Sequence, residues 1–414
     1  MKHPAISTFD SVDLNELAAT FKTPLYVYSQ TKIEEQVSEL QRALSEVKHL
    51  TCYAVKANSN LSILRLFNKL GTGFDVVSAG ELRRIEKIEG DFSKVVISGV
   101  GKTREEIALA LEKGVKVINV ESLAELGVVL EVAHTAAKVA PIGFRLNPDV
   151  LLDTHPHNVT GSKESKFGMP KTDITAAWDM VRSCDVASLV GVSTHVGSGG
   201  SEIEPFAQSY AALLEAAREF SALGASIKYI DVGGGFAVSY SGAYQPLNLI
   251  KLKALMESLT QGTEYVLILE PGKFLVAEAG ILLTRVLYRK ANGAQKFIVV
   301  DAGMNDLIRP SLYEAYHKID VVAQPAEKRV ARREIVDVVG PVCESGCFFA
   351  RAREIPQVRE GDVLAIRDTG AYGFSMASHY NSRPLAAEVL VHHGNVTLIR
   401  KRDGIEELWH NELL

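Results

Sequence analysis

The feature that most constrains this chain is the alternation of short apolar runs with longer amphipathic stretches between about residues 50 and 270. Most of the runs are continuously apolar, as strands buried on both faces are. There are eight such runs: Leu50–Val55, Gly73–Val77, Lys94–Ile97, Val115–Val120, Ala140–Leu146, Val190–His195, Ile227–Val232 and Tyr265–Leu269. Helical spacing of apolar residues is seen in the stretches Ser59–Leu70, Ala79–Ile88, Thr103–Lys113, Ser122–Val132 and Pro205–Leu223.

This alternation, repeated eight times, predicts a closed (β/α)8 barrel of the TIM type, in which parallel strands form an inner ring and helices cover it. An open doubly wound sheet would produce a similar alternation. The count of eight and the length of the region favour the barrel. At 414 residues the chain is long enough for two domains.

From about Gly280 the pattern changes to strands joined by short turns, and Asn292-Gly293 is a hairpin-type turn signal. The expected strands are Ile281–Tyr288, Lys296–Val300, Arg333–Val339, Asp362–Ile366, Ala387–Val391 and Val396–Arg400. We therefore predict an α/β chain with a barrel domain at residues 25–279 and a β-rich C-terminal domain at 280–414. The sequence leaves open whether residues 1–24, or the segment around Pro24–Tyr28, pack with the second domain.

Composition excludes several classes of protein. A net charge of −5 without a basic stripe argues against nucleic-acid binding, and no apolar run approaches the ~20 residues of a membrane-spanning helix. Four sparse cysteines favour a reducing cytoplasm over a disulfide framework. Cys343 and Cys347 form C-x-x-x-C, but no second Cys or His pair with zinc-like spacing accompanies them, so no metal site is expected.

Polar residues follow four of the predicted barrel strands, at the end where such barrels place their active sites. Lys56 closes the first strand, and His195 and Ser198 close the sixth. Taken alone, such a lysine is more often a surface charge that ends a strand, and a lone histidine at the rim is more often structural than catalytic. A desolvated lysine, however, is also a nucleophilic amine.

The seventh strand ends in Gly233, Gly234 and Gly235, and three glycines allow backbone N–H groups to approach an anion. A short glycine run also suits a tight turn. The eighth strand is followed by Glu270, Pro271, Gly272 and Lys273. One rim thus offers an amine, an imidazole, a carboxylate and a phosphate-binding loop. These are the groups that pyridoxal 5'-phosphate (PLP) requires.

The chain resembles the fold-type III PLP-dependent decarboxylases with alanine-racemase-like barrels, and within them the bacterial diaminopimelate decarboxylases. The similarity runs nearly end to end, with its motifs in the same order. They are YAVKANSN at 53–60, GFDVVSAGEL at 73–82, ISGVGKT at 97–103, RLNPDV at 145–150, SKFGM at 165–169, HVGS at 195–198, DVGGGF at 231–236, LEPGK at 269–273, DAGMNDLIRPSLYEAYH at 301–317, GPVCESG at 340–346 and GAYGFSMASHYNSRP at 370–384.

The resemblance implies roles for individual residues around PLP. Lys56 would hold the cofactor as a Schiff base, with Asp75 nearby, and Glu270 would pair with the pyridinium nitrogen. His195 would stack on the ring. The phosphate would be held by Ser198, by the Gly233–Gly235 loop, by the loop from Glu270 through Pro271 and Gly272 to Lys273, and by the hydroxyl of Tyr372.

The resemblance also implies how substrate is bound. Arg309 and Tyr313 are four residues apart with Pro310 at a helix start, so their side chains can share a face; in the family this pair holds the amino acid's carboxylate. Without the family match, the simpler interpretation would be structural: an arginine at the start of a helix and an amphipathic tyrosine on the same face, with no role in binding. In the resembling enzymes Cys343 and Glu344 come from the partner subunit, as proton donor and ligand of the substrate's amino group. A homodimer with composite sites follows.

Three positions depart from the family pattern. Lys273 stands where arginine is usual, Gly199 replaces a glutamine, and Cys347 replaces an aspartate. A lysine keeps the charge but loses bidentate carboxylate recognition. With Tyr372, Lys273 lies on the substrate side of the expected site, so these departures bear on substrate preference more than on decarboxylation itself.

We therefore predict a cytoplasmic PLP-dependent carboxy-lyase that converts meso-2,6-diaminopimelate to L-lysine and CO₂, the last step of lysine biosynthesis. The alternative is decarboxylation of ornithine, arginine or a siderophore precursor. An alanine-racemase-like activity would need a tyrosine base and no Cys-Glu segment. A Schiff-base aldolase would not need the carboxylate for the pyridinium nitrogen. A non-catalytic relative would be expected to lose the lysine or the cysteine, whereas Lys56, Glu270 and Cys343 are all present.

Overall fold

The computed structural model describes residues 6–147, 165–323 and 332–414, so the end of the RLNPDV motif, residues 148–150, lies outside the described residues. The chain forms two compact units. The barrel unit comprises Val37–Val238 and Gln245–Phe274, and the β-rich unit comprises Met1–Gln36, Ser239–Tyr244 and Leu275–Leu414. The β-rich unit therefore takes in more of the N-terminus than residues 1–24, and a short segment within the predicted barrel range.

The barrel unit contains a closed ring of eight parallel strands. Its strands are β4 (His49–Ala54), β5 (Gly73–Val76), β6 (Val95–Ile97), β7 (Val117–Val120), β8 (Ala140–Arg145), β9 (Ala187–Ser193), β10 (Tyr229–Asp231) and β11 (Val266–Leu269). They follow one another around the ring in chain order, and β11 pairs with β4 to close it. Each matches one of the eight predicted runs, so the barrel is confirmed and the open sheet is excluded.

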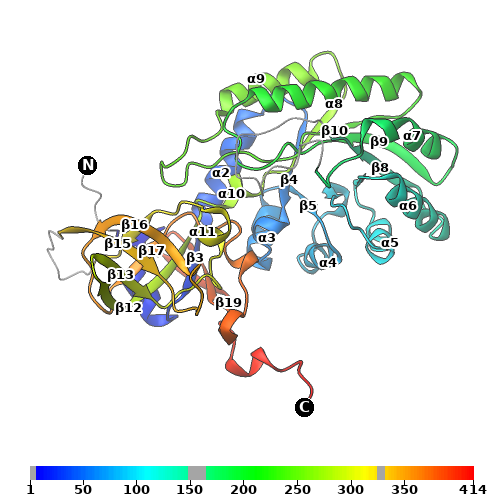
Figure 1. Ribbon diagram of the computed structural model, residues 1–414. Coiled ribbons are helices and arrows are strands. Elements are labelled where there is room, and N and C mark those ends of the chain that lie inside the picture. Colours follow the sequence, from blue (N-terminus) through cyan, green and yellow to red (C-terminus); the bar gives the residue numbers. More distant parts are fainter. Residues whose placement is uncertain (1–5, 148–164, 324–331) are drawn as a thin grey trace. The chain divides into compact units, whose positions relative to one another are not determined.

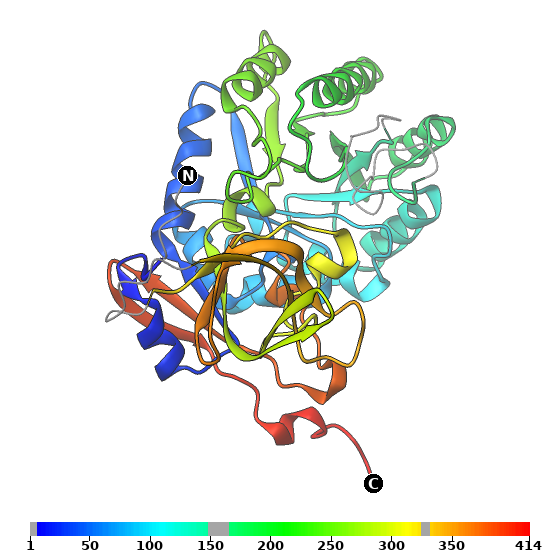
Figure 2. The ribbon, with the colours of Figure 1, turned by 60° about the vertical axis from the view of Figure 1, so that its left-hand side comes forward.

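Helices follow the strands and lie outside the ring (Figures 1 and 2). They are α3 (Leu61–Lys69), α4 (Ala79–Lys87), α5 (Arg104–Lys113), α6 (Leu123–Thr135), α7 (Ile174–Arg182), α8 (Glu204–Ala222) and α9 (Leu249–Thr260). Several begin with a polar cap: Asn60, Ser78 and Ser122 each accept a hydrogen bond from a backbone N–H of the first turn. These three caps end their strand-to-helix loops at a defined residue, which helps to hold the loop residues in place at the rim.

Part of the barrel interior is filled by apolar side chains. Cys52, Val96, Val117 and Ile268 are buried there, with partly buried neighbours packed against them. This is the layered interior expected of a small barrel. Buried polar side chains such as Asp75, Asp231 and Glu270 lie at or near the carboxyl ends of the strands, where the candidate site forms.

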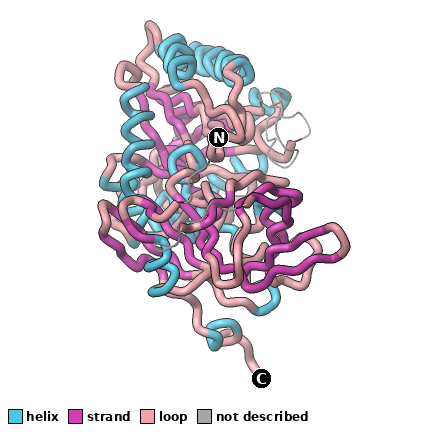
Figure 3. Tube along the Cα trace, turned by 90° about the vertical axis from the view of Figure 1, so that its left-hand side faces the viewer, coloured by secondary structure: helices cyan, strands magenta, loops and turns pink. Residues whose placement is uncertain are grey.

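The β-rich unit is built on a sheet in the order β16-β15-β13-β12-β3-β18-β19, with β17 pairing with β12 and β14. Figure 3 shows its strands in magenta. Its strands are β1 (Thr8–Phe9), β2 (Val12–Asp13), β3 (Leu25–Ser29), β12 (Gly280–Asn292), β13 (Gln295–Val300), β14 (Ile319–Val321), β15 (Arg333–Val339), β16 (Phe348–Pro356), β17 (Val363–Ile366), β18 (Ala387–His392) and β19 (Asn395–Arg400).

Four further α-helices complete the α-helical content of the described residues: α1 (Leu14–Thr20), α2 (Gln30–Ala43), the single turn α10 (Lys273–Val276) and the short α11 (Arg309–Tyr313). Short 3₁₀ turns are η1 (Val55–Ala57), η2 (Phe92–Lys94), η4 (Lys171–Asp173), η5 (Phe374–Met376), η6 (Tyr380–Ser382) and η7 (Ile405–Leu408). None of the helices in the described part of the chain is long and apolar enough to cross a membrane.

Several strands of the β-rich unit were not predicted, among them β1, β2 and β14. The segment Leu25–Ser29, inside the predicted barrel range, is strand β3; it pairs with β12 and β18, so its five buried residues belong to this core. Strand β16 was not predicted. It is the end strand of the sheet order and carries exposed charged residues, so the apolar alternation that signals a strand is weak there. The Asn292-Gly293 hairpin is confirmed between β12 and β13.

Candidate active site

Lys56 lies directly beyond β4, in the 3₁₀ turn Val55–Ala57. Its ammonium nitrogen Nζ is 2.5 Å from Oδ2 of Asp75, in the neighbouring strand β5. The Lys56 side chain is 40% exposed, whereas that of Asp75 is fully buried. The ion pair therefore anchors a reachable amine at the rim of the barrel. The other carboxylate oxygen of Asp75, Oδ1, is buried without a hydrogen-bond partner among the described residues.

The three glycines after β10 approach neighbouring backbone too closely for any side chain. A Cβ at Gly234 would lie 2.2 Å from the carbonyl oxygen of Glu270, and one at Gly235 would lie 1.9 Å from that of Gly197. Gly235, at φ +89°, accepts backbone hydrogen bonds through its carbonyl from the N–H groups of Gly199 and Gly200. The glycine loop is thus hydrogen-bonded to the loop after β9, which contains Ser198. A side-chain-free backbone of this kind suits an anion such as a phosphate.

His195, at the end of β9, is a neutral imidazole. Its Nδ1 accepts a hydrogen bond of 3.2 Å from the backbone N–H of Gly234, so Nδ1 carries no proton. Burial lowers the pKa of His195 well below its usual value, and the positive charges of Arg145, Lys56 and Lys273 lower it further. The ring is therefore uncharged at neutral pH and can stack against another ring.

Glu270, directly after β11, is a buried carboxyl with little compensating charge. It is 9% exposed, and Oε1 accepts a hydrogen bond of 3.4 Å from Ser98 Oγ. Burial raises the pKa of Glu270 well above its usual value, and the negative charges of Asp231 and Asp75 raise it further. A carboxyl in this state gains most from a buried cationic partner, because a cation would stabilise its ionised form.

A polar network around Glu270 was not predicted from the sequence. Asn119 Nδ2, from β7, donates to Ser98 Oγ at 3.2 Å and to Asp231 Oδ2 at 3.0 Å. Burial raises the pKa of Asp231 to about 6. All of these residues are buried. The detectable signal was a polar residue inside or directly after an otherwise apolar strand, which is unusual for a barrel interior.

A second buried network spans the ends of β6, β7 and β8. Arg145 Nη1 pairs with Glu121 Oε1 at 2.8 Å, and Glu121 Oε2 accepts from the backbone N–H of Gly168 at 2.9 Å. Lys102 pairs with Glu125 at 2.7 Å, with its side chain 1% exposed. These residues also escaped the sequence prediction. The network ties three strand ends together and places the positive charge of Arg145 near His195.

The loop after β11 packs directly against the turn that carries Lys56. The carbonyl of Pro271 accepts a 3.4 Å hydrogen bond from the N–H of Ala54, and a Cβ at Gly272 would lie 3.0 Å from that of Ala57. Lys273 begins the single helical turn α10. Within the barrel unit the structure thus brings together all of the predicted residues at the rim: Lys56, Asp75, His195, Ser198, Gly233, Gly234, Gly235, Glu270, Pro271, Gly272 and Lys273.

The remaining predicted residues belong to the β-rich unit. Arg309 and Tyr313 begin and end the short helix α11, and proline stands in its first turn as expected. Arg309 is 6% exposed, and its guanidinium carbon lies 4.9 Å from the ring centroid of Tyr240. Tyr372 is half-buried, with a left-handed backbone at φ +55°.

Cys343 and Glu344 lie on the loop between β15 and β16, and both are exposed. The backbone N–H of Cys343 donates to Asn381 Oδ1 at 2.8 Å, and Glu344 Oε1 accepts from the N–H of Gly346 at 3.3 Å. Local contacts thus fix the backbone of Cys343 and the carboxylate of Glu344 at the surface. All four cysteines, each within the described residues, are free thiols.

Two of the departures from the family pattern have a local structural explanation. Gly199 adopts φ +99°, and its N–H donates to the Gly235 carbonyl at 2.8 Å, so this backbone suits glycine better than glutamine. Cys347 is buried, and its sulfur accepts a hydrogen bond of 3.3 Å from the N–H of Met304. An aspartate could accept the same bond, so the cysteine keeps an acceptor there.

Comparisons with known proteins agree with this geometry. The family described as pyridoxal-dependent decarboxylase, pyridoxal binding domain, matches residues 30–277. The diaminopimelate decarboxylase of Pseudomonas aeruginosa is 44% identical over 98% of this chain and 96% of its own length. That of Haemophilus influenzae is 42% identical over 97% and 95%.

Solved structures extend the comparison to three dimensions. The crystal structure of diaminopimelate decarboxylase from Helicobacter pylori, complexed with L-lysine, superposes with a TM-score of 0.92 at 40% identity. The match covers 97% of this chain and 99% of that one. The resemblance inferred from the motifs is therefore confirmed over nearly the full length, and the chain belongs to the pyridoxal-dependent decarboxylases, in the family of diaminopimelate decarboxylases.

Proposed function

We propose that this chain is a PLP-dependent carboxy-lyase that converts meso-2,6-diaminopimelate to L-lysine and CO₂, the last step of lysine biosynthesis. The observation that carries the proposal is the rim of the barrel, where a reachable lysine, a buried carboxyl and a side-chain-free loop lie together. The substrate follows from the full-length similarity to enzymes named diaminopimelate decarboxylase, one of them solved with L-lysine bound.

The residues present fit PLP. Lys56 offers an amine 2.5 Å from a carboxylate that keeps one oxygen unpartnered. Burial and the charges of Asp231 and Asp75 raise the pKa of Glu270, and a protonated pyridine nitrogen would supply a cation that favours its ionised form. The glycine loop, together with Ser198, the backbone of residues 270–273 and Tyr372, would hold the phosphate.

When bound, PLP supplies an electron sink for the negative charge left at Cα as CO₂ departs. Glu270, oriented by the hydroxyl of Ser98, would pair with the ring nitrogen of the cofactor and keep it protonated. His195 presents an uncharged ring face, since its Nδ1 is occupied by the N–H of Gly234. Asp75 Oδ2 holds the proton-bearing Nζ of Lys56 in place.

The substrate would be oriented by side chains of the β-rich unit. We assign its distal carboxylate to Arg309 and Tyr313, and its distal amino group to Glu344. The Cys343 thiol would return a proton to Cα after CO₂ leaves. Exposure of Cys343 and Glu344 supports a homodimer in which this loop serves the site of the partner subunit. Four free cysteines support a reducing compartment, which we take to be the cytoplasm.

The substrate is tested by CO₂ release from meso-diaminopimelate, its stereoisomers, ornithine, arginine and lysine. We expect release from meso-diaminopimelate to exceed that from every other compound, with L-lysine as product. A preference for ornithine or arginine would instead assign the chain to the alternative decarboxylation.

The cofactor is tested on the same preparation by borohydride reduction and peptide mapping. The pyridoxyl label should appear on Lys56, and Lys56→Ala should abolish both the label and CO₂ release. A label on any other lysine contradicts the assignment of Lys56.

A further inference from the structure

Arg309 is a buried cation without a counter-ion in the described structure. It is 6% exposed and forms no ion pair with any described residue. Its guanidinium donates a hydrogen bond from Nη1 to His317 Nε2 at 3.0 Å. A buried charge left unpaired is costly, and such costs are retained where a ligand supplies the missing partner.

The hydrogen bonds of His317 determine its tautomer. Its Nδ1 lies 2.8 Å from the carbonyl oxygen of Arg367, which can only accept, so Nδ1 carries the proton. Nε2 faces the guanidinium of Arg309, which can only donate, so Nε2 must present its lone pair. One neutral tautomer satisfies both contacts. A second proton would place two donors and two positive charges face to face.

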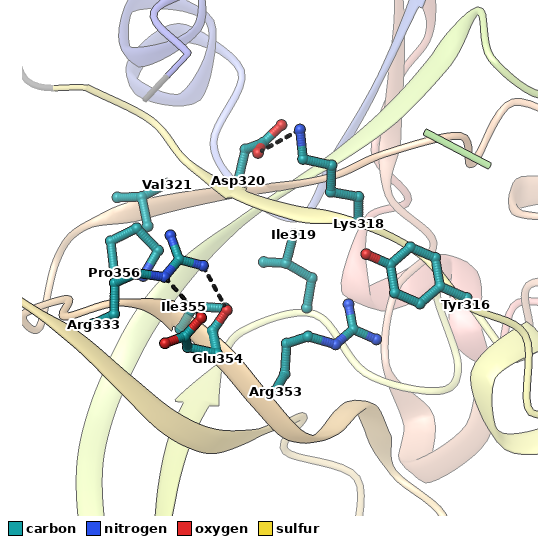
Figure 4. A pocket seen from close by; sticks show the side chains of 10 residues that line it. All are labelled: Tyr316, Lys318, Ile319, Asp320, Val321, Arg333, Arg353, Glu354, Ile355 and Pro356. Atoms are coloured by element: carbon teal, nitrogen blue, oxygen red, sulfur yellow. Dashed lines mark hydrogen bonds and ion pairs between the residues drawn. The ribbon is translucent and has the colours of Figure 1, made fainter. Parts of the chain in front are cut away.

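His317 is held rigidly in this orientation. The residue is fully buried, and its backbone carbonyl accepts from Arg353 Nη1 at 3.0 Å. The Arg353 guanidinium carbon lies 4.2 Å from the ring centroid of Tyr316, and both side chains line a cavity of about 140 Å³ (Figure 4). The pKa of His317 is lowered to about 3, first by burial and then by the charge of Arg309.

Tyr240 provides a second contact to the same guanidinium. The guanidinium of Arg309 lies over the Tyr240 ring. The ring centroids of His317 and Tyr240 are 5.6 Å apart, in a T-shaped arrangement with an interplanar angle of 90°. Tyr240 and Ser241 both have left-handed backbones, at φ +47° and +56°, and Ser241 Oγ donates to Asp368 Oδ2 at 2.5 Å. Consecutive residues in this region are strained, and such strain is concentrated at sites that need a defined geometry.

We propose that His317 and Tyr240 are positioning residues that hold the guanidinium of Arg309 as a receptor for the carboxylate of an α-amino acid. His317 engages Nη1 and the Tyr240 ring covers one face. The guanidinium is thereby oriented so that its remaining N–H groups can take a planar carboxylate in a fixed direction. This inference rests on the proposed function, in which Arg309 binds the carboxylate that stays on the product.

The test compares two ligands that differ only in that carboxylate. L-Lysine carries it, and 1,5-diaminopentane does not. Inhibition constants of both are measured on the PLP-loaded enzyme, together with KM and kcat for meso-diaminopimelate. In His317→Asn the amide can still donate to Arg367, but no acceptor reaches Arg309. The preference for L-lysine is the ratio of the inhibition constant of 1,5-diaminopentane to that of L-lysine. We expect this ratio to fall about 10-fold, while the inhibition constant of 1,5-diaminopentane stays unchanged. KM for meso-diaminopimelate should rise with little change in kcat.

The matched variant is His317→Gln, whose longer amide can place an oxygen near the position of Nε2. It should restore at least part of the preference for L-lysine. Equal weakening of both ligands, or no difference between His317→Gln and His317→Asn, would overturn the proposal, because a merely structural histidine predicts that result.

Two further variants keep the test decisive. If His317→Asn does not fold, Tyr240→Leu removes the ring face and should lower the preference for L-lysine about 3-fold, within the range of cation–π contacts. An unchanged preference in a folded Tyr240→Leu enzyme would contradict the role of Tyr240. Arg309→Met should abolish the preference. If it does not, Arg309 is not the carboxylate receptor, and the error lies in the proposed function rather than in the contacts of His317.

Discussion

At the rim of the barrel, the close approach of neighbouring backbone segments limits which residue types can occupy single positions. Gly235 is the clearest case, because a Cβ would overlap the carbonyl oxygen of Gly197 at 1.9 Å. A backbone carbonyl cannot move aside as a flexible side chain can, since it belongs to the loop after β9. The absence of a side chain there is therefore a requirement of packing as well as of backbone conformation.

Replacement of Gly235 by alanine separates these two effects when compared with a second glycine. Gly224 has a similar left-handed φ of +96°, but nothing lies within 4 Å of its added Cβ. We expect Gly224→Ala to cost about 1 kcal/mol, from backbone strain alone. Gly235→Ala should cost more than about 4 kcal/mol or prevent PLP retention, because the loop must move.

Urea unfolding and the absorbance of bound PLP measure both effects for the two variants. Equal losses of stability would show that conformation, and not the approach of the Gly197 carbonyl, explains the glycine.

At the scale of elements, the starts of the neighbouring helices α4 and α5 share hydrogen bonds to one carboxylate. Thr103 begins α5 with a capping box: its side chain accepts from the N–H of Glu106, and Glu106 Oε2 accepts from the N–H of Thr103 at 2.9 Å. The other oxygen of Glu106, Oε1, accepts from the N–H of Ala79 at 2.8 Å, in the first turn of α4. One carboxylate thus serves the starts of two neighbouring helices.

Glu106→Ala should lower the free energy of unfolding by about 2 kcal/mol, since both helix starts lose an acceptor for a backbone N–H. Glu105→Ala is the matched control: this residue is exposed in the same turn and is outside the capping box. Its loss should stay within about 0.5 kcal/mol. Chemical denaturation measures both, and equal effects would mean that the carboxylate acts only through the helix dipole.

At the scale of the whole molecule, buried acids make stability depend on pH. Asp306 is 2% exposed, and its Oδ2 accepts from the N–H of Gly303 at 2.8 Å. Burial raises its pKa from the usual 3.8 to about 6. The folded state therefore binds more protons than the unfolded state between these values. Its contribution to stability is fully present below pH 3.8 and is lost as the pH rises through about 6.

Asp306→Asn keeps an acceptor for Gly303 but cannot ionise. The gain in unfolding free energy of the variant over the parent should therefore be larger at pH 7.5 than at pH 4, by up to about 3 kcal/mol. Asp91→Asn gives the opposite sign, because hydrogen bonds from Ser93 lower the pKa of Asp91. Urea titrations at both pH values measure the difference, and a pH-independent gain would mean that the fold does not raise the pKa of Asp306.

Much of the architecture and of the candidate site could be predicted because both depend on local pattern. Continuous apolar runs between amphipathic helices indicate buried parallel strands. The carboxyl ends of such strands meet at one rim, so Lys56, His195 and Glu270 could be placed together from their positions alone. The residue roles added by the family resemblance remain predictions, and the test on Lys56 addresses the first of them.

The sequence by itself thus determined the barrel and its rim. Only the tertiary structure decided which distant segments share a core: β3 pairs with β12 and β18, and Tyr240 packs with Arg309 and His317. It also decided the network of Ser98 and Asn119 beneath Glu270. The reason is physical. Hydrophobic periodicity records which face of an element is buried, but not its partner, and a buried polar residue reveals its role only through the group that satisfies it.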